Sequence, residues 1–404
     1  TGNRNIALGG VAMYRTGGTN GENSDDNIAI GYQAMGGDWS STTDASSNKN
    51  VAIGNYAMDG SMNAALNNVA VGYAALGALT EGDSNVVVGY EAGLDLTTGD
   101  DNTLIGYKAG EDITTSDQNV IIGSGAGATM SSGTNNCVLI GQAAGDAINS
   151  GDAAGTVAIG YHAGGGITSG QWGTFLGYEA GNANQTGNSM TALGYQAGYS
   201  NTTDHNVFVG MEAGLYSTSA DSCVFIGTGA GKGNSSARLT GNNNVFIGRN
   251  SGSVLQGGTN SNTFVGHETG VACTTGGNNT FIGSEAGQSV TEGIGNTLIG
   301  YGAGLAGTDL TTGDYNVHVG YWNGPNAADG NYRFSLGYNL DHTSNERFMV
   351  GASSNYAYLD FDSGGAWEIT SDRRRKCNIK DDTLGLEFIN LLSTKTFQWK
   401  PSEE

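Results

Sequence analysis

Aspartates in three similar loops are the side chains of this 404-residue chain whose type and spacing come closest to a cation site. Carboxylate oxygens are ligands that Ca²⁺ prefers. The loops match no fixed calcium-loop spacing, so the sequence favours solvated turns, with Ca²⁺ as the open alternative and no other cofactor expected. The loops read Asp95-Leu-Thr-Thr-Gly-Asp-Asp-Asn102, Asp112-Ile-Thr-Thr-Ser-Asp-Gln-Asn119 and Asp309-Leu-Thr-Thr-Gly-Asp-Tyr-Asn316.

Histidines, cysteines and other acids show no spacing typical of catalysis or metal binding. Cys137 and Cys223 hold equivalent positions five repeats apart, which at about 4.8 Å per repeat is about 24 Å, too far for a disulfide. We therefore expect small, buried, unpaired cysteines. The acids define no pair across a glycosidase cleft, so no turnover enzyme is expected. The histidines are residues 162, 205, 267, 318 and 342, and the cysteines are residues 137, 223, 273 and 377.

Trp39 is the candidate for contact with a sugar. It lies in one of the widest repeats of the chain, and extra residues in a repeat protein normally form outward loops. We expect the segments 38–40 and 236–239 to bulge outward for this reason. An exposed Trp39 could stack on a glycan, or it could equally cap the end of the fold.

The elements that position these residues are short repeats. Twenty glycines between Gly9 and Gly351 each follow an aliphatic residue, and nine of the nineteen intervals between them are 17 residues long. A fixed short period marks a stacked solenoid, because one unit cannot bury its apolar face alone. The sequence therefore predicts an all-β chain, a parallel β-solenoid (β-roll) of about 20 short rungs, and a rod about 90 Å long at about 4.8 Å per rung.

Each rung has one apolar segment before its glycine. The residue three before the glycine is Val, Ile or Thr in eighteen rungs, and the residue four before is Asn in thirteen. We expect the asparagines to form an amide ladder. Tyr follows the glycine in ten rungs, and we interpret these tyrosines as a stacked structural ladder rather than a sugar platform.

The residue two before the glycine is also apolar, from Ala29 and Ala52 early in the chain to Phe225 and Phe264 later. Because neighbouring strand residues face opposite ways, such strands are apolar on both faces and must be covered on both. We expect the residues two before the glycine to face other copies of the chain around a shared axis, giving a homo-oligomer. A monomer covered by its own loops is the alternative.

Charge separates the C-terminal segment from the rod. The chain carries a net charge of −22, with only 16 basic residues, and seven of those lie in residues 371–404. The acidic rod would repel phosphate, so nucleic acid is not expected as a partner. No apolar run approaches the about 20 residues that span a bilayer, so membrane insertion is not expected. The chain opens almost inside a repeat, and we expect a further segment before Thr1.

The repeat core Asn-Val-Ala-Ile-Gly at 50–54, with Asn-Ile-Ala-Ile-Gly at 27–31, resembles the head repeats of trimeric autotransporter adhesins. Similar repeats occur in bacteriophage tail fibres. The resemblance covers about residues 5–324 and implies a left-handed parallel β-roll assembled as a homotrimer. The rungs here are longer than those of the adhesins, and the chain lacks the coiled-coil stalk and membrane-anchor strands of that family.

The segment Thr370-Ser-Asp-Arg-Arg-Arg-Lys-Cys-Asn-Ile-Lys380 resembles the start of the self-cleaving intramolecular chaperone domain of endosialidases and phage tail fibres. The resemblance implies that Ser371 is the nucleophile and Lys376 its base, cutting the Thr370–Ser371 bond once. Nearby arginines would crowd the lysine and favour its neutral form. Arg375 replaces the usual Leu, and only 34 residues of this longer domain are present, so we expect this chain to stay uncut.

These observations predict three parts: a β-roll rod (1–324), a β-rich connector (325–370) and the start of a chaperone domain (371–404). The expected function is a structural or adhesive fibre of a phage or phage-like particle, on the virion tail fibre or at a cell surface. Its expected partners are its own copies and a host-surface glycan or protein receptor. A bacterial cell-surface adhesin and a polysaccharide-depolymerising tailspike are the alternatives.

Overall fold

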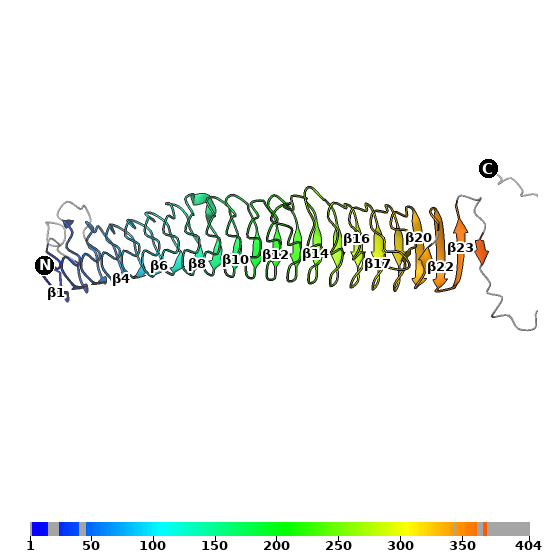
Figure 1. The fold of residues 1–404 in the computed structure, drawn as a ribbon. Coiled ribbons are helices and arrows are strands. Elements are labelled where there is room, and N and C mark those ends of the chain that lie inside the picture. Colours follow the sequence, from blue (N-terminus) through cyan, green and yellow to red (C-terminus); the bar gives the residue numbers. More distant parts are fainter. Residues whose placement is uncertain (1, 15–23, 40–45, 343, 362–366, 370–404) are drawn as a thin grey trace, which may run out of the picture.

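The computed structural model describes residues 2–14, 24–39, 46–342, 344–361 and 367–369. These residues form one long rod built of short strands, with one rung of chain stacked on the next (Figure 1). The short 3₁₀ helix η2 (Gly151–Ala153) lies in a loop. Within the described ranges, no helix is long and apolar enough to cross a membrane.

Every rung contributes one strand, usually three residues long, that ends just before its turn glycine, except that the last two strands of the stack have six residues and run past Gly337 and Gly351. The strands of the stack are β1 (Ile6–Leu8), β2 (Ile28–Ile30), β3 (Val51–Ile53), β4 (Val69–Val71), β5 (Val86–Val88), β6 (Thr103–Ile105), β7 (Val120–Ile122), β8 (Val138–Ile140), β9 (Val157–Ile159), β10 (Thr174–Leu176), β11 (Thr191–Leu193), β12 (Val207–Val209), β13 (Val224–Ile226), β14 (Val245–Ile247), β15 (Thr263–Val265), β16 (Thr280–Ile282), β17 (Thr297–Ile299), β18 (Val317–Val319), β20 (Arg333–Tyr338) and β22 (Arg347–Ala352).

Each of these strands pairs in parallel with the next, and equivalent residues lie side by side, as in Val86 beside Thr103 and Val88 beside Ile105. The parallel stack continues through β20 to β22. The direction then reverses, because β23 (Asn355–Asp360) and β24 (Trp367–Ile369) pair antiparallel. A minor pair, β19 (Gly324–Pro325) and β21 (Asp341–His342), lies beside the stack. The predicted parallel β-solenoid is confirmed.

The turn glycine is required by the distance between rungs. Gly106 has φ +140°, and a Cβ atom there would lie 2.5 Å from the carbonyl oxygen of Gly123 in the next rung. No side chain fits at that distance, and L-residues rarely adopt this φ. The glycine column therefore lets consecutive rungs approach to hydrogen-bonding distance.

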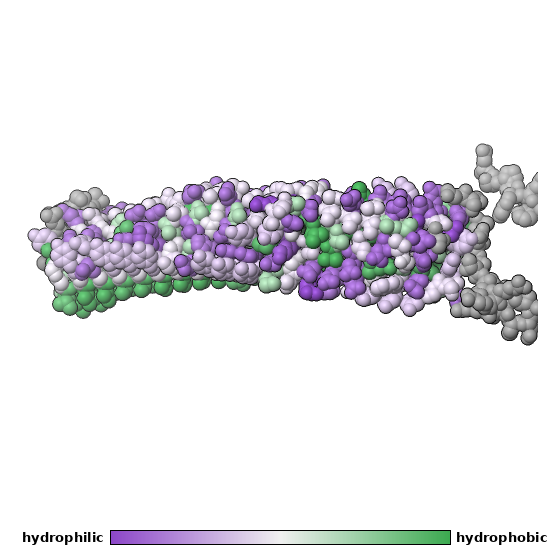
Figure 2. All heavy atoms as spheres, viewed as in Figure 1, coloured by the Kyte–Doolittle hydropathy of each residue, from purple (hydrophilic) through white to green (hydrophobic). Residues whose placement is uncertain are grey.

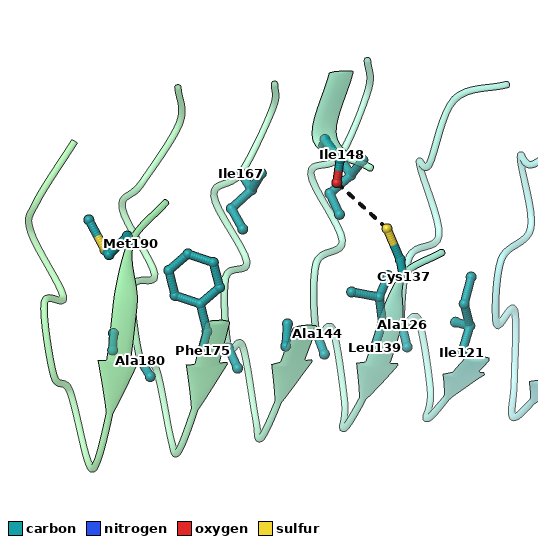
Figure 3. Close-up of a cluster of buried hydrophobic side chains, with 14 of the residues drawn as sticks. Ile121, Ala126, Cys137, Leu139, Ala144, Ile148, Ile167, Phe175, Ala180 and Met190 are labelled. Atoms are coloured by element: carbon teal, nitrogen blue, oxygen red, sulfur yellow. Dashed lines mark hydrogen bonds between the residues drawn. The ribbon is translucent and has the colours of Figure 1, made fainter. Parts of the chain in front are cut away.

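The core of the rod lies inside each single chain. The middle residue of each strand points inward, and the Ala three residues after the glycine faces it from the returning segment. Figure 3 shows Ile121, Leu139 and Phe175 pointing from their strands toward Ile148 and Met190 of the loops. All five are fully buried. The glycine four after the turn makes room, since a Cβ on Gly181 would lie 2.1 Å from Phe175.

This arrangement corrects one prediction. We expected the residues two before the glycine to face other copies of the chain, but Ala29, Ala52, Phe225 and Phe264 are fully buried within one chain. The phenylalanines stack on one another, with ring centroids 4.6 Å apart for Phe264 and Phe281. The sequence pattern indicates that neighbouring residues of a strand face opposite ways, but it does not indicate which face of the strand is inside.

The predicted asparagine ladder is confirmed. The buried Asn102 illustrates it: its backbone N–H and its Nδ2 donate to Asn85 Oδ1, at 3.0 and 3.1 Å, and Nδ2 also donates to Ser116 O at 2.7 Å. Where Cys137 replaces asparagine, its backbone N–H still donates to Asn119 Oδ1 at 2.9 Å. The ladder satisfies backbone groups that the turn would otherwise leave buried and unpaired.

Candidate functional site

The outward face of the strands is an apolar stripe that runs along the rod. We define the apolar stripe as the two outward residues of each strand of the stack, which lie one and three positions before the turn glycine. The position nearer the glycine is always Val, Ile or Leu, and the other is Val, Ile, Phe or, in six strands, Thr. Figure 2 shows the stripe as a continuous green edge along the N-terminal half of the rod.

The stripe is exposed to solvent in the single chain. Val88 is 36% exposed, Ile105 37% and Leu176 43%. Parallel pairing holds equivalent residues in register, so each stripe residue stacks on its counterpart in the neighbouring rungs. The strand backbones are fixed by hydrogen bonds on both sides, so the stripe is a preformed surface. A continuous exposed apolar surface of this length marks a binding or association site.

A tyrosine ladder lies two residues beyond the stripe, just after the turn glycine. Tyr73, Tyr90 and Tyr107 stack with ring centroids 5.1 and 5.4 Å apart. Two further blocks stack in the same way: Tyr161, Tyr178 and Tyr195, then Tyr301, Tyr321 and Tyr338. These rings cover one another's faces and present their edges to solvent, which confirms a structural ladder. Rings arranged this way offer few open faces for sugar stacking.

Between the second and third blocks no tyrosine follows the turn glycine, Arg249 and His267 occupy that position in two rungs, and ion pairs lie nearby. Arg249 donates to Glu268 Oε1 at 3.1 Å and contacts His267 Nε2. Lys232 donates to Glu212 Oε2 at 2.7 Å. Such exposed pairs contribute little stability, because solvent screens them. They nevertheless give this part of the rod surface a different polarity from the tyrosine blocks.

The predicted site residues are not brought together by the structure. Trp39 is fully buried, and its indole N–H donates to Gly60 O at 3.3 Å, so the proposed glycan contact at this residue is wrong. Its side chain fills the rod near the N-terminal end, in line with the capping alternative. Ser371 and Lys376, predicted for self-cleavage, lie outside the described residues.

The described part of the chain holds no cluster of side chains suited to metal binding, and its cysteines are unpaired. There, no group of three or more His, Cys, Asp or Glu side chains could hold a metal ion. Cys137, Cys223 and Cys273 are free and buried, as predicted. Burial raises the pKa of the Cys223 thiol to about 11 and that of the Cys273 thiol to about 12. Both stay protonated at neutral pH and are poor nucleophiles.

Two surface features were missed by sequence reasoning. A second ladder of Asp and Asn lies six residues before the turn glycine, where Asp83 N–H donates to Asp100 Oδ1 at 2.7 Å and Asp100 N–H to Asp117 Oδ1 at 2.9 Å. One aspartate of each acidic loop, namely Asp100, Asp117 or Asp314, therefore has a structural role, because its carboxylate accepts a backbone hydrogen bond. Trp172 is 66% exposed. The recurrence of Asp or Asn six residues before the turn glycine is the sequence signal that could have revealed the second ladder.

The chain was compared with models of protein families, with curated proteins and with solved structures, and it matches none of them.

Proposed function

We propose that the chain is a structural, adhesive fibre protein of a phage or phage-like particle, and that it works as a homotrimer packed through the apolar stripe. The apolar stripe is the observation that carries the proposal. Strands that are apolar on both faces are typical of sheets covered on both faces. The described loops cover the inner face alone, so a second copy of the chain is the simplest cover for the outer one.

Parallel, in-register packing suits the stripe best. The stripe holds the same place in every rung, so copies related by rotation about an axis along the rod would bring equivalent rungs together over its whole length. Closed rotational symmetry also avoids open-ended growth. The choice of three copies rests on the resemblance of the repeats to trimeric adhesin heads.

The shape of the rod supports the proposed adhesive role. A rod with its strand face packed inside a trimer would expose its loops to the surroundings, where a host-surface glycan or protein could bind. Residues 371–404 lie outside the described residues, and their proposed role as the beginning of a self-cleaving chaperone rests on sequence resemblance. A virion tail fibre is the location that fits both resemblances.

The stripe can be tested with paired lysine substitutions. Val88→Lys with Ile105→Lys places charges on the stripe, whereas Thr98→Lys with Thr115→Lys adds the same charge at exposed loop positions of neighbouring rungs. Burying an unpaired ammonium is strongly unfavourable. We expect sedimentation to show a trimer of 41.2 kDa chains for the wild type and for the loop variant, and dissociation of the stripe variant.

A folded, monomeric wild-type protein would contradict the proposal. Circular dichroism of the stripe variant distinguishes loss of association from loss of fold. If both double variants dissociate equally, added charge rather than the stripe is responsible, and the stripe is not the interface.

A further inference from the structure

An open cavity of about 620 Å³ lies on the loop side of the rod, beside the rungs of β14, β15 and β16. Its lining residues include Arg238, Gln256, Thr259, Asn260, Thr275 and Asn278. None of these residues belongs to the strands that form the apolar stripe. Packing of copies through the stripe would therefore leave this cavity facing outward.

One wall of the cavity, formed by Ala237 and Arg238, comes from extra residues in the rung between Gly227 and Gly248, one of the widest of the chain. Sequence analysis predicted that segment 236–239 bulges outward, but Leu239 points inward and is fully buried. Leu239 forms parallel bridges with Ser217 on one side and Gly257 on the other. The insertion is thus tied into the stack as an additional short segment of sheet.

This anchoring places Arg238 on the outside. Adjacent residues in an extended segment face opposite ways, so the buried Leu239 turns the Arg238 side chain outward, where it is exposed. Gly257 N–H donates to Arg238 O at 2.9 Å, and Thr240 N–H donates to Gly257 O at 2.8 Å. The backbone that carries the guanidinium is therefore held on the wall of the cavity.

Arg238 differs from most other cations of the described rod because it lacks a carboxylate partner. Carboxylate oxygens pair with the cations at positions 4, 108, 232, 249 and 347. Arg333 is buried and donates to Asn345 Oδ1. Among the described residues, no carboxylate oxygen lies within 4.0 Å of Arg238. On a chain with a net charge of −22, Arg238 thus places an exposed guanidinium with no carboxylate partner on the wall of a cavity.

We propose that this cavity binds a carboxylate-bearing saccharide, with Arg238 as the residue that holds the carboxylate. A guanidinium presents two parallel N–H donors that match a carboxylate. The amides of Gln256 and Asn278 and the hydroxyl of Thr275 can donate and accept hydrogen bonds, as sugar hydroxyls require, while the Asn260 amide oxygen accepts the N–H of Asn242 at 2.6 Å and leaves its NH₂ group as a donor. Specific ligand sites combine such a few convergent polar groups with a concave surface.

An acidic sugar fits the charges better than other anions. One guanidinium balances one carboxylate, whereas a phosphate dianion would keep a negative charge within a strongly acidic rod. A neutral sugar would leave the guanidinium without its partner. The proposal deepens the adhesive part of the proposed function and rests on it for its biological meaning. The cavity itself lies within one chain and does not require the trimer.

The test measures binding of tetragalacturonate to the full chain by isothermal titration calorimetry. The same oligosaccharide with its carboxyls methyl-esterified, and inorganic phosphate, are the comparison ligands. We expect the free acid to bind at least tenfold more tightly than the ester. Arg238→Gln should weaken binding of the acid at least tenfold, and Lys49→Gln should leave it unchanged. Lys49 is another exposed cation, and it lies far along the chain from the cavity. Lys49→Gln removes one positive charge, as Arg238→Gln does, so the two variants have the same net charge.

Three results would overturn the proposal: equal binding of the acid by wild type and Arg238→Gln, equal binding of acid and ester, and binding of phosphate alone. Failure of the acid to bind at all would also overturn it. Sedimentation of the same samples reports association of the chains separately. A trimer that binds no acidic sugar therefore rejects this site while leaving the fibre proposal standing.

Discussion

At the scale of single residues, the buried asparagine column shows how a polar side chain can stabilise an interior. Each asparagine donates to a carbonyl of the next turn and accepts a backbone N–H from the neighbouring rung, as Asn102 does with Ser116 O and the N–H of Asn119. A buried amide is costly when unpaired. Here the amide NH₂ group and the amide oxygen are both hydrogen-bonded, so the asparagine column aligns each rung with the next.

Replacing Asn102 with alanine should destabilise the rod by about 3 kcal/mol. The substitution leaves the Ser116 carbonyl and the Asn119 N–H without these partners inside the protein, and each unsatisfied buried group costs about 1 to 3 kcal/mol. Thr115→Ala, at an exposed position in the neighbouring loop, should change stability by less than about 0.5 kcal/mol. Thermal unfolding at one fixed protein concentration measures both. Equal unfolding temperatures would mean that the ladder does not stabilise the fold.

Two tryptophans in loop segments show that residue type alone does not predict whether a side chain is buried. Trp39 and Trp172 both lie in loop segments, yet Trp39 is fully buried and Trp172 is 66% exposed. Trp172 occupies a left-handed backbone position, with φ 55°, five residues before its turn glycine. The direction of each side chain depends on its place in the rung, which the residue type alone does not reveal.

At the scale of the element, one rung is a strand, a glycine turn and a returning segment that includes a second glycine or another left-handed residue. Two kinds of glycine serve different purposes. Gly106 is needed because the next rung's carbonyl occupies the space of a Cβ atom, whereas Gly125 has φ 65° with open space around its Cβ position. Gly106 is required by packing, whereas Gly125, which lies two residues after the turn glycine Gly123, is favoured only by backbone conformation.

These two glycines should respond differently to alanine. Gly125→Ala meets no neighbouring atom, so it should cost about 1 kcal/mol, the usual penalty for a left-handed L-residue. Gly106→Ala places a Cβ 2.5 Å from Gly123 O, so the rungs must separate, and we expect a loss above about 4 kcal/mol. Chemical denaturation of the two variants, which lie in adjacent rungs, measures the difference. Similar losses would show that steric contact between rungs is not what requires glycine at position 106.

At the scale of the whole molecule, an apolar stripe and a high negative charge act against each other. Burial of the stripe between copies favours association, since apolar area removed from water stabilises by about 25 cal/mol per Å². The net charge of −22 on each chain opposes it, because parallel packing brings like charges together. Salt screens the repulsion and leaves the apolar contribution in place.

Association should therefore become stronger as salt is added. We expect the temperature at which the copies dissociate to rise between about 0.05 M and about 0.5 M sodium chloride, where the screening length falls from roughly 14 to 4 Å. Light scattering during heating measures the dissociation. A fall in that temperature with added salt would indicate an interface held by ion pairs, and the apolar stripe would then not be the contact between copies.

The sequence by itself determined the architecture. The spacing of Gly106 and Gly123, the aliphatic residue before each glycine and the asparagine four before it were sufficient to predict a parallel β-solenoid, its rung length and its amide ladder. This was possible because a stacked repeat places equivalent residues in contact, so the pattern in the chain is also the pattern in space. The stacked tyrosines and buried cysteines follow from the same rule.

The tertiary structure alone decided which face of each strand is inside. Period-two alternation shows that Phe225 and its neighbours Val224 and Ile226 face opposite ways, but all three are apolar, so hydrophobicity cannot assign the faces. The returning segment decides the matter, because its small Ala and Gly residues leave room for the middle side chain of the strand. Packing between rungs also turned Leu239 inward and left Arg238 on the surface. Only the stacking of three rungs determines which side of an inserted loop is covered.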